Sequence, residues 1–257
     1  MKAVNRDSKI EQLSRRIRNC RRCDLALTRH NALPGEGNLN ADLFFIAQAP
    51  GREEDKEGCM FIGPSGKVLD QLFSFLDFDR EDVYMTNLVK CFLPKCRKPH
   101  QEEINSCSIY LDKEILLVNP SVLIPLGYHA TKAVLGRYQF NIPNRKSFPD
   151  LFGNLKTAGK RKIFPLRHPS AVVHNKNLFE ILKKNYLKLN VIMRTCKWYS
   201  MCPMKVYYEK GMLSKSWIEQ YCKGDWSACT RYKMEEKGLP HPDNMLPDGT
   251  IDQTLKK

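Results

Sequence analysis

Residues 42–51 read DLFFIAQAPG and give the clearest indication of the fold. Residues 42–49 form an apolar run that ends at a Pro-Gly pair, which is typical of a buried parallel strand that runs into a tight turn. Strands of this kind alternate with helices in α/β proteins. The stretch therefore predicts an α/β domain whose ligands bind beyond the carboxyl end of this strand.

The sequence on either side repeats the strand–helix alternation. Apolar periodicity predicts helices and short apolar runs predict strands. The helices are expected over residues 8–19, 65–77, 101–117, 129–135 and 177–194, and the further strands over residues 83–86, 121–126 and 163–166. Residues 137–162 are basic and are expected to form a loop. The pattern predicts a three-layer α/β domain with a central, mostly parallel, four-stranded sheet.

Four cysteines of the first half have the spacing of a metal site. Cys20 and Cys23 form a Cys-x-x-Cys pair, and Cys91 and Cys107 follow with fifteen residues between them. Zinc and buried free thiols are alternatives to an iron–sulfur cluster. Because distant parts of the chain supply these cysteines, residues 20–107 are expected to form one compact unit.

The composition limits the class of protein and its partners. The chain has 257 residues, a net charge of +14 and ten cysteines, but no apolar run of the roughly eighteen residues that a membrane span needs. The N-terminal residues lack the apolar core of a signal peptide. We therefore expect a cytoplasmic protein that is a monomer, has no membrane partner and binds metal instead of forming disulfides. The basic charge favours a nucleic-acid partner.

The composition changes near residue 195. Residues 196–257 contain all three tryptophans and four more cysteines, Cys196, Cys202, Cys222 and Cys229, and they end in a polar tail. Five, nineteen and six residues separate these cysteines, which matches no standard zinc finger. The residues predict a small Cys-rich appendage that follows a domain of residues 1–195. A second iron–sulfur cluster, zinc, and a disulfide or free thiols all remain open for it.

Four motifs occur in order along residues 1–195. They are AQAPGREEDKEGCMFIGPSGKVLD (residues 47–70), TNLVKC (86–91), IPLGYHATKAVLG (124–136) and FPLRHPSAVV (164–173). Together with the first cysteine quartet, they resemble the family 4 uracil-DNA glycosylases, the iron–sulfur type. The resemblance covers residues 8 to about 195. It implies a [4Fe–4S] cluster on Cys20, Cys23, Cys91 and Cys107, and leaves Cys59 and Cys96 as ordinary thiols.

The resemblance also implies the chemistry of the site. The family hydrolyses the bond between a flipped-out uracil and its deoxyribose in DNA and leaves an abasic site, as part of base excision repair. Phe61 is expected to stack on the base, Asn87 to hydrogen-bond its edge, and His168 to donate to uracil O2 as negative charge develops there. Ala49 and Gly51 are expected to contact the substrate, and Ser170 to hold the DNA backbone.

Gln48 departs from the family pattern. Family 4 enzymes usually have glutamate at this position, and a glutamine amide cannot act as a general base. Family 1 enzymes have glutamine here, but the aspartate that follows it is replaced by Ala49. Gln48 is expected to orient a water molecule or contact uracil, and Asp55 is a weak candidate for the missing acid. Two alternatives stay open: a glycosylase fold that binds nucleic acid with weak or no excision, and a glycosylase for another modified base.

Overall fold

The computed structural model describes residues 2–159, 161–196, 198–199 and 201–255. The chain divides into two compact units, residues 1–187 and 188–257, and the division falls within the last long helix, α7 (Phe179–Met193). In the described residues, no helix combines the length and the apolar character needed to cross a bilayer.

The first unit is built on a twisted sheet whose strand order is β1-β3-β2-β4-β6-β5. Neighbouring pairs among β3, β2, β4 and β6 are parallel, whereas β1 and β5 pair antiparallel at the two edges. The strands are β1 (Glu36–Gly37), β2 (Leu43–Ala47), β3 (Tyr84–Asn87), β4 (Val122–Pro125), β5 (Lys156–Ala158) and β6 (Arg161–Ile163). The three-layer α/β prediction is confirmed, but the described sheet has six strands where four were predicted.

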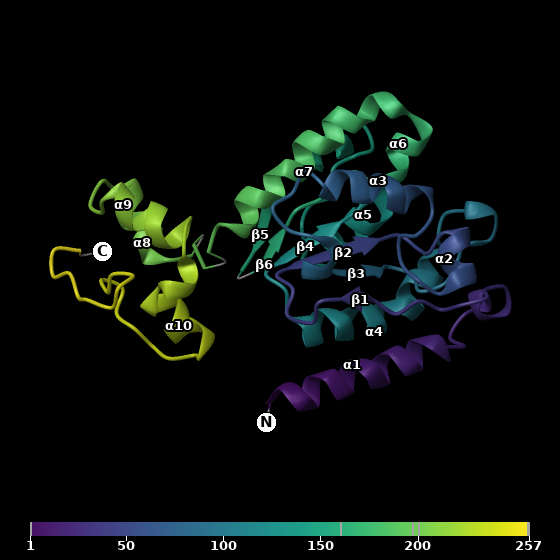
Figure 1. Cartoon of the computed structure of the whole chain (residues 1–257), viewed down its shortest axis with the longest axis horizontal. Helices are drawn as coiled ribbons and strands as arrows, with labels where there is room; N and C mark the ends of the chain where they lie inside the picture. Colours follow the sequence, from purple (N-terminus) through teal and green to yellow (C-terminus); the bar gives the residue numbers. More distant parts are fainter. Residues whose placement is uncertain (1, 160, 197, 200, 256–257) are drawn as a thin grey trace. The chain divides into compact units, whose positions relative to one another are not determined.

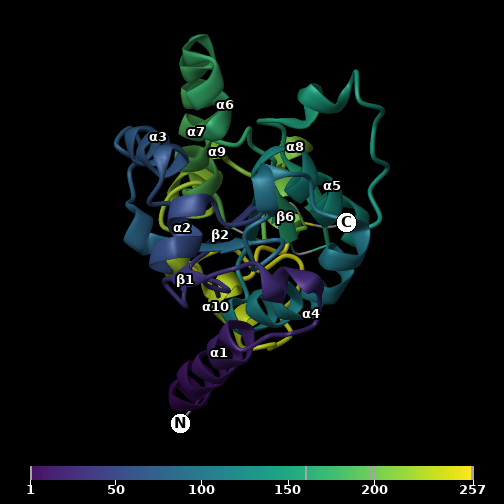
Figure 2. The same ribbon diagram turned by 90° about the vertical axis from the view of Figure 1, so that its right-hand side faces the viewer.

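Helices cover both faces of the sheet (Figure 1). The helices of this unit are α1 (Lys2–Arg18), α2 (Arg52–Glu57), α3 (Pro64–Phe73), α4 (Gln101–Val118), α5 (Gly127–Arg137), α6 (Ser170–His174) and the first part of α7. Every residue of β2 is buried, because alternate side chains face opposite layers. Phe44 lies in a core that includes residues of α1, α4 and α5, and Phe45 packs against Phe73 of α3. Figures 1 and 2 both show α1 alongside α4.

The parallel strands bring the ends of the predicted motifs to one edge. Ala47 at the end of β2 pairs with Asn87 at the end of β3. A single parallel bridge between Leu126 and Leu166 extends the pairing beyond β4 and β6. Gly127 and His168, which follow these two residues, therefore lie close to each other. Gly127 has a φ of +78°, and a Cβ on it would lie 3.1 Å from the Cβ of His168. This close approach is why the position requires glycine.

The second unit is a small assembly of short helices. They are α8 (Pro203–Glu209), α9 (Lys215–Trp217), a π-helical turn (Ile218–Cys222) and α10 (Thr230–Glu236). Its core gathers Met204, Tyr207, Leu213, Ile218, Cys222 and Leu255. Such a core is small for about seventy residues, a size at which domains usually need a further stabilising element.

Candidate active site

Two cavities lie beyond the carboxyl ends of the parallel strands. The smaller has a volume of about 110 Å³ and is lined by Ala47, Ala49, Pro50, Gly51, Glu54, Met60, Phe61, Ser65, Asn87 and His168. The larger, of about 350 Å³, is lined on its polar side by Gln48, Arg97, His129, His168 and Ser170. Ala49, Pro50, Gly51 and His168 line both, so the two cavities adjoin. The small cavity brings together Phe61, Asn87 and His168, which the sequence places far apart.

Phe61 is held in an uncommon backbone conformation. Its φ is +53°, which is unfavourable for a residue with a side chain, and such strain is stored where the surroundings impose it. Arg80 donates to the carbonyl oxygens of Met60 and Phe61 at 3.1 and 3.3 Å. Gly66 of α3 lies against the same segment, since a Cβ there would come within 1.7 Å of the Phe61 oxygen. The Phe61 and His168 rings face each other with centroids 6.3 Å apart.

Asn87 presents an amide to the small cavity from the last position of β3. The side chain is buried, and its Nδ2 donates to the sulfur of Met60 at 3.0 Å, a weak acceptor. A stronger acceptor on a bound molecule would therefore be a better partner for this group.

A buried ion pair supports the strand that carries Asn87. Lys90 Nζ lies 2.6 Å from Glu114 Oε2, and both side chains are almost fully buried. Thr86 donates its hydroxyl to the same carboxylate oxygen at 2.8 Å, and the Gly35 N–H donates to the other oxygen at 2.8 Å. These hydrogen bonds satisfy the buried charges and tie β3 to α4 and the β1 loop.

His168 is neutral at physiological pH. Burial lowers the pKa of its imidazole to about 4. The Ser170 N–H donates to Nδ1 at 3.1 Å, and the Ser170 hydroxyl lies 2.8 Å from the same atom. Because Nδ1 accepts these bonds, the proton of the neutral ring resides on Nε2. His168 is therefore set up as a neutral hydrogen-bond donor at the cavity wall.

Gln48 lines the larger cavity and not the smaller one. Its backbone oxygen accepts from the Val89 N–H at 3.0 Å, which joins the motif to the segment after β3. The backbone of Gly51 lies against the Glu54 carboxylate, because a Cβ on Gly51 would lie 2.2 Å from one of its oxygens.

Glu54 is a site residue that the sequence analysis passed over in favour of Asp55. It is the acidic residue among the described residues that line the two cavities. Its side chain is buried and accepts from the Gly63 N–H at 2.9 Å. Both residues stand in the acidic run 53–55, and the signal that separates them is the neighbouring Gly51, which leaves room for the Glu54 carboxylate.

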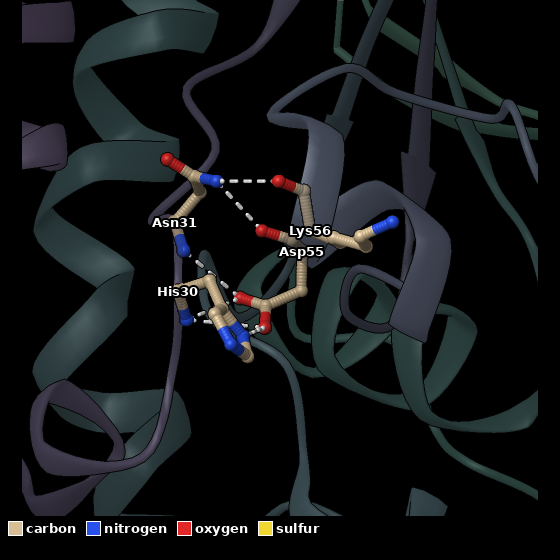
Figure 3. A network of polar contacts seen from close by, with 4 residues as sticks. All are labelled: His30, Asn31, Asp55 and Lys56. Atoms are coloured by element: carbon tan, nitrogen blue, oxygen red, sulfur yellow. Dashed lines mark hydrogen bonds and ion pairs between the residues drawn. The ribbon is translucent and has the colours of Figure 1, made fainter.

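Asp55 binds the backbone of the loop at His30 and Asn31 (Figure 3). Its carboxylate accepts from the backbone N–H groups of His30 and Asn31 at 3.1 Å, and His30 Nδ1 lies 2.9 Å from Oδ2. The Asn31 amide donates to the backbone oxygens of Asp55 and Lys56. Asp55 thus anchors the loop after Leu27 to α2, and it is absent from the described lining of both cavities.

The first cysteine quartet comes together between α1, α4 and the segment after β3. The four thiols are near enough to affect one another: Cys107 and Cys23 add to the effect of burial on the pKa of Cys91, and Cys23 and Cys20 add to it at Cys107. Burial raises the pKa of the Cys91 thiol to about 11, against the opposing effect of Arg29. Arg29 Nη1 donates to the Cys91 sulfur at 3.0 Å, and the Lys90 N–H donates to the Cys107 sulfur.

These thiols are not placed around a single metal ion. Across the described residues, no three His, Cys, Asp or Glu side chains are arranged to ligate one ion. A cubane cluster places its thiolates farther apart, because each thiolate binds a different iron. The donor set of four thiols with cationic and N–H donors fits such a cluster.

The site can hold one flat ring and stabilise negative charge on it. An aromatic face, a side-chain amide and a neutral imidazole donor surround one small cavity, and a carboxylate stands at its wall. Together these groups suit reactions in which a planar heterocycle leaves as an anion.

Comparison with known proteins agrees with this geometry. A family model described as the uracil DNA glycosylase superfamily matches residues 34–191. A type-4 uracil-DNA glycosylase of Sulfurisphaera tokodaii is 35% identical over 81% of this chain and 93% of its own length. Those of Saccharolobus solfataricus and Archaeoglobus fulgidus are 36% and 33% identical, each over 70% of this chain and over 84% and 91% of their own lengths. The chain belongs to the uracil DNA glycosylase superfamily.

Proposed function

We propose that this protein is a monofunctional uracil-DNA glycosylase, which hydrolyses the N-glycosidic bond of a flipped-out uracil and leaves an abasic site. The observation that carries the proposal is the small cavity shared by Phe61, Asn87 and His168 in a member of this superfamily. The type-4 relatives, which are named for this activity, support it.

Recognition of uracil follows from the polar groups of the small cavity. A base that leaves the duplex loses stacking, which the Phe61 ring replaces. The Asn87 amide can accept from uracil N3–H and donate to the 4-oxo group. Cytosine offers an acceptor at N3 and a donor at its exocyclic amine, so both bonds would be mismatched. The net charge of +14 favours association with the DNA backbone.

Bond cleavage places negative charge on uracil and positive charge on the sugar. The Nε2–H of His168 would donate to O2 as charge develops there, and its low pKa keeps it a neutral donor. Gln48, at the wall of the larger cavity, would position the attacking water through its amide. The Glu54 carboxylate would supply the anion near the sugar cation that the usual glutamate of position 48 supplies elsewhere in family 4.

Cys20, Cys23, Cys91 and Cys107 would hold a [4Fe–4S] cluster. The cluster would serve as a covalent tie between the N-terminal segment, the chain after β3 and α4. Cys91 lies four residues beyond Asn87, and the Lys90 N–H donates to the Cys107 sulfur, so the tie ends close to the base-reading amide. We assign residues 1–195 to the glycosylase domain and residues 196–257 to a Cys-rich appendage of a cytoplasmic, monomeric protein.

An oligonucleotide assay tests the function. Purified protein is incubated with single- and double-stranded oligonucleotides that contain uracil, hypoxanthine or no lesion, and abasic sites are then cleaved with alkali. We expect strand scission at uracil alone. Binding of the uracil oligonucleotide without scission would identify a binding protein, and scission at hypoxanthine alone would identify a glycosylase for another base.

A further inference from the structure

The second unit contains four cysteines that the glycosylase site does not use. Cys196, Cys202, Cys222 and Cys229 lie outside residues 34–191, which the family model matches. Cys196, Cys222 and Cys229 are buried, and Cys202 is half-buried. They come from four segments: the residues after α7, the start of α8, the end of the π-helical turn and the start of α10. Thiols in reducing cytoplasm that are gathered in this way are typical of metal ligands.

The fold brings the four segments to one place. The Cys196 N–H donates to the Cys222 carbonyl oxygen at 2.7 Å, which joins two ligand segments directly. Burial raises the pKa of the Cys222 thiol to about 12, and the nearby thiols of Cys202, Cys196 and Cys229 shift it in the same direction. Cys202 also acts on Cys229. Each member of the quartet therefore lies within electrostatic range of Cys222.

A buried arginine beside the quartet forms no ion pair with a carboxylate among the residues that the structure describes. Arg231 is 2% exposed, and its Nη1 donates to the carbonyl oxygens of Pro242, Asp243 and Met245 at 2.9, 3.1 and 2.7 Å. Its Nε and Nη2 atoms are buried and have no hydrogen-bond partner among the described residues. Its positive charge acts on both Cys222 and Cys229. A buried, partly unpaired guanidinium is costly unless negative charge lies near it.

The N–H groups at the start of α10 are also directed at sulfur. The backbone N–H groups of Arg231 and Tyr232 donate to the Cys229 sulfur. Hydrogen bonds of this kind stabilise thiolates and the metal centres that they bind. The first quartet has the same features, since Arg29 and a backbone N–H donate to two of its sulfurs.

We propose that Cys196, Cys202, Cys222 and Cys229 bind a second iron–sulfur cluster, of the [4Fe–4S] type. Four thiolates and the cluster carry net negative charge, which compensates the buried guanidinium of Arg231. The described cysteines of neither quartet are arranged around one ion, as a single zinc would require. The cluster would join the four segments of a unit whose apolar core is small.

Iron analysis of the full-length protein tests the inference. The protein is purified and reconstituted anaerobically, and iron and acid-labile sulfide are measured for the wild type and for the Cys222→Ser, Cys107→Ser and Cys59→Ser variants. Two clusters predict about eight irons per wild-type chain and about four in each of the first two variants. Cys59 is exposed and lies outside both quartets, so Cys59→Ser is the matched control and should keep about eight.

Tryptophan fluorescence provides a second readout that is local to this unit. The three tryptophans, Trp198, Trp217 and Trp226, all lie in the second unit. Trp217 stacks on Tyr221, next to Cys222, with centroids 5.7 Å apart. Iron–sulfur clusters absorb broadly where tryptophan emits, so the intact cluster should quench this emission. We expect emission to rise several-fold when the wild-type clusters are bleached by oxidation, and also in Cys222→Ser, but not in Cys107→Ser.

Several outcomes would overturn the inference, and none depends on excision activity. About four irons per wild-type chain, all lost in Cys107→Ser, would leave no second cluster. Zinc that is present in the wild type and lost in Cys222→Ser would replace the cluster with a zinc site. If Cys222→Ser does not fold, the partly exposed Cys202 gives the milder variant Cys202→Ser, and the wild-type iron count and bleaching still decide.

Discussion

His168 is shielded from solvent and also forms part of the wall of both cavities. It is buried enough for its pKa to fall to about 4. The backbone N–H of Ser170 donates to Nδ1 and thereby fixes the tautomer of the ring. The residue is therefore a donor whose protonation does not change near neutrality.

Replacement of His168 tests this role. We expect His168→Ala to reduce the single-turnover excision rate by about a hundredfold or more, the usual cost of a lost oxyanion donor, while DNA binding is retained. His174→Ala, an exposed histidine of α6, is the control. An unchanged rate in His168→Ala, measured at saturating enzyme, would remove His168 from the mechanism.

The low pKa of His168 also predicts the pH dependence. The folded protein keeps this imidazole neutral until the pH approaches its pKa of about 4, whereas the unfolded chain binds the proton near pH 6.5, the ordinary pKa of histidine. The excision rate should therefore show no His168 step near pH 6.5. The contribution of His168 to stability is fully present above pH 6.5 and is lost as the pH falls toward 4. Urea unfolding of the wild type and His168→Asn across this range measures the difference, and parallel pH curves would contradict it.

We propose that Gln48 and Glu54 share the roles of the glutamate usual at position 48: Gln48 positions the water, and Glu54 supplies the negative charge near the sugar. We predict that Gln48→Glu raises the excision rate, because it restores the acid usual in the family, and that Glu54→Gln lowers it, because the cavity loses its carboxylate while the bond to the Gly63 N–H is kept. Single-turnover rates of both variants decide this, with Glu53→Gln, an exposed neighbour, as the control. An inactive Gln48→Glu would show that the glutamine has a positive role of its own.

The strand β3 and the helix α4 are joined by the buried Lys90–Glu114 pair. We expect Glu114→Gln to destabilise the protein by about 3–5 kcal/mol, because Lys90 is then left as an uncompensated buried charge. Glu102→Gln, on the exposed side of the same helix, should change stability by less than about 0.5 kcal/mol. Denaturant unfolding of both variants, followed by circular dichroism, measures the difference. Equal stabilities would mean that Thr86 and Gly35 hold β3 without the ion pair.

The whole first unit depends on ligands that are far apart in the chain. We expect the purified protein to be brown, with broad absorbance near about 400 nm. Cys91→Ala and Cys107→Ala should each lose the part of this absorbance that the first cluster contributes and should be less soluble than the wild type, because the loss of that cluster releases the N-terminal segment from α4. Cys59→Ser should stay brown and soluble. A colourless wild type with stoichiometric zinc would contradict the cluster assignment.

The helices and strands with a clear apolar pattern were predicted well, whereas the short edge strands, which are defined only by hydrogen bonds to a neighbouring strand, were not predicted. Residues 42–49 gave a clear strand signal because β2 is buried on both faces. The strands β1 and β5 are two and three residues long, and edge pairing alone defines them. The basic stretch 137–162 was expected to be a loop, but it contains β5 and the start of β6, because a hairpin of polar residues carries no apolar pattern.

The α/β fold, the resemblance to a family and the choice of Phe61, Asn87 and His168 as candidate residues could all be inferred from the amino-acid sequence alone. These conclusions depend on local patterns and motifs, which are properties of consecutive residues. The folded structure was needed to show that Glu54 lines the cavity while Asp55 binds the loop at His30, because adjacent residues of a helix point in different directions. The same holds for Arg231: its charge in the sequence suggests a solvated side chain, and only packing places it, buried and partly unpaired, beside the second cysteine quartet.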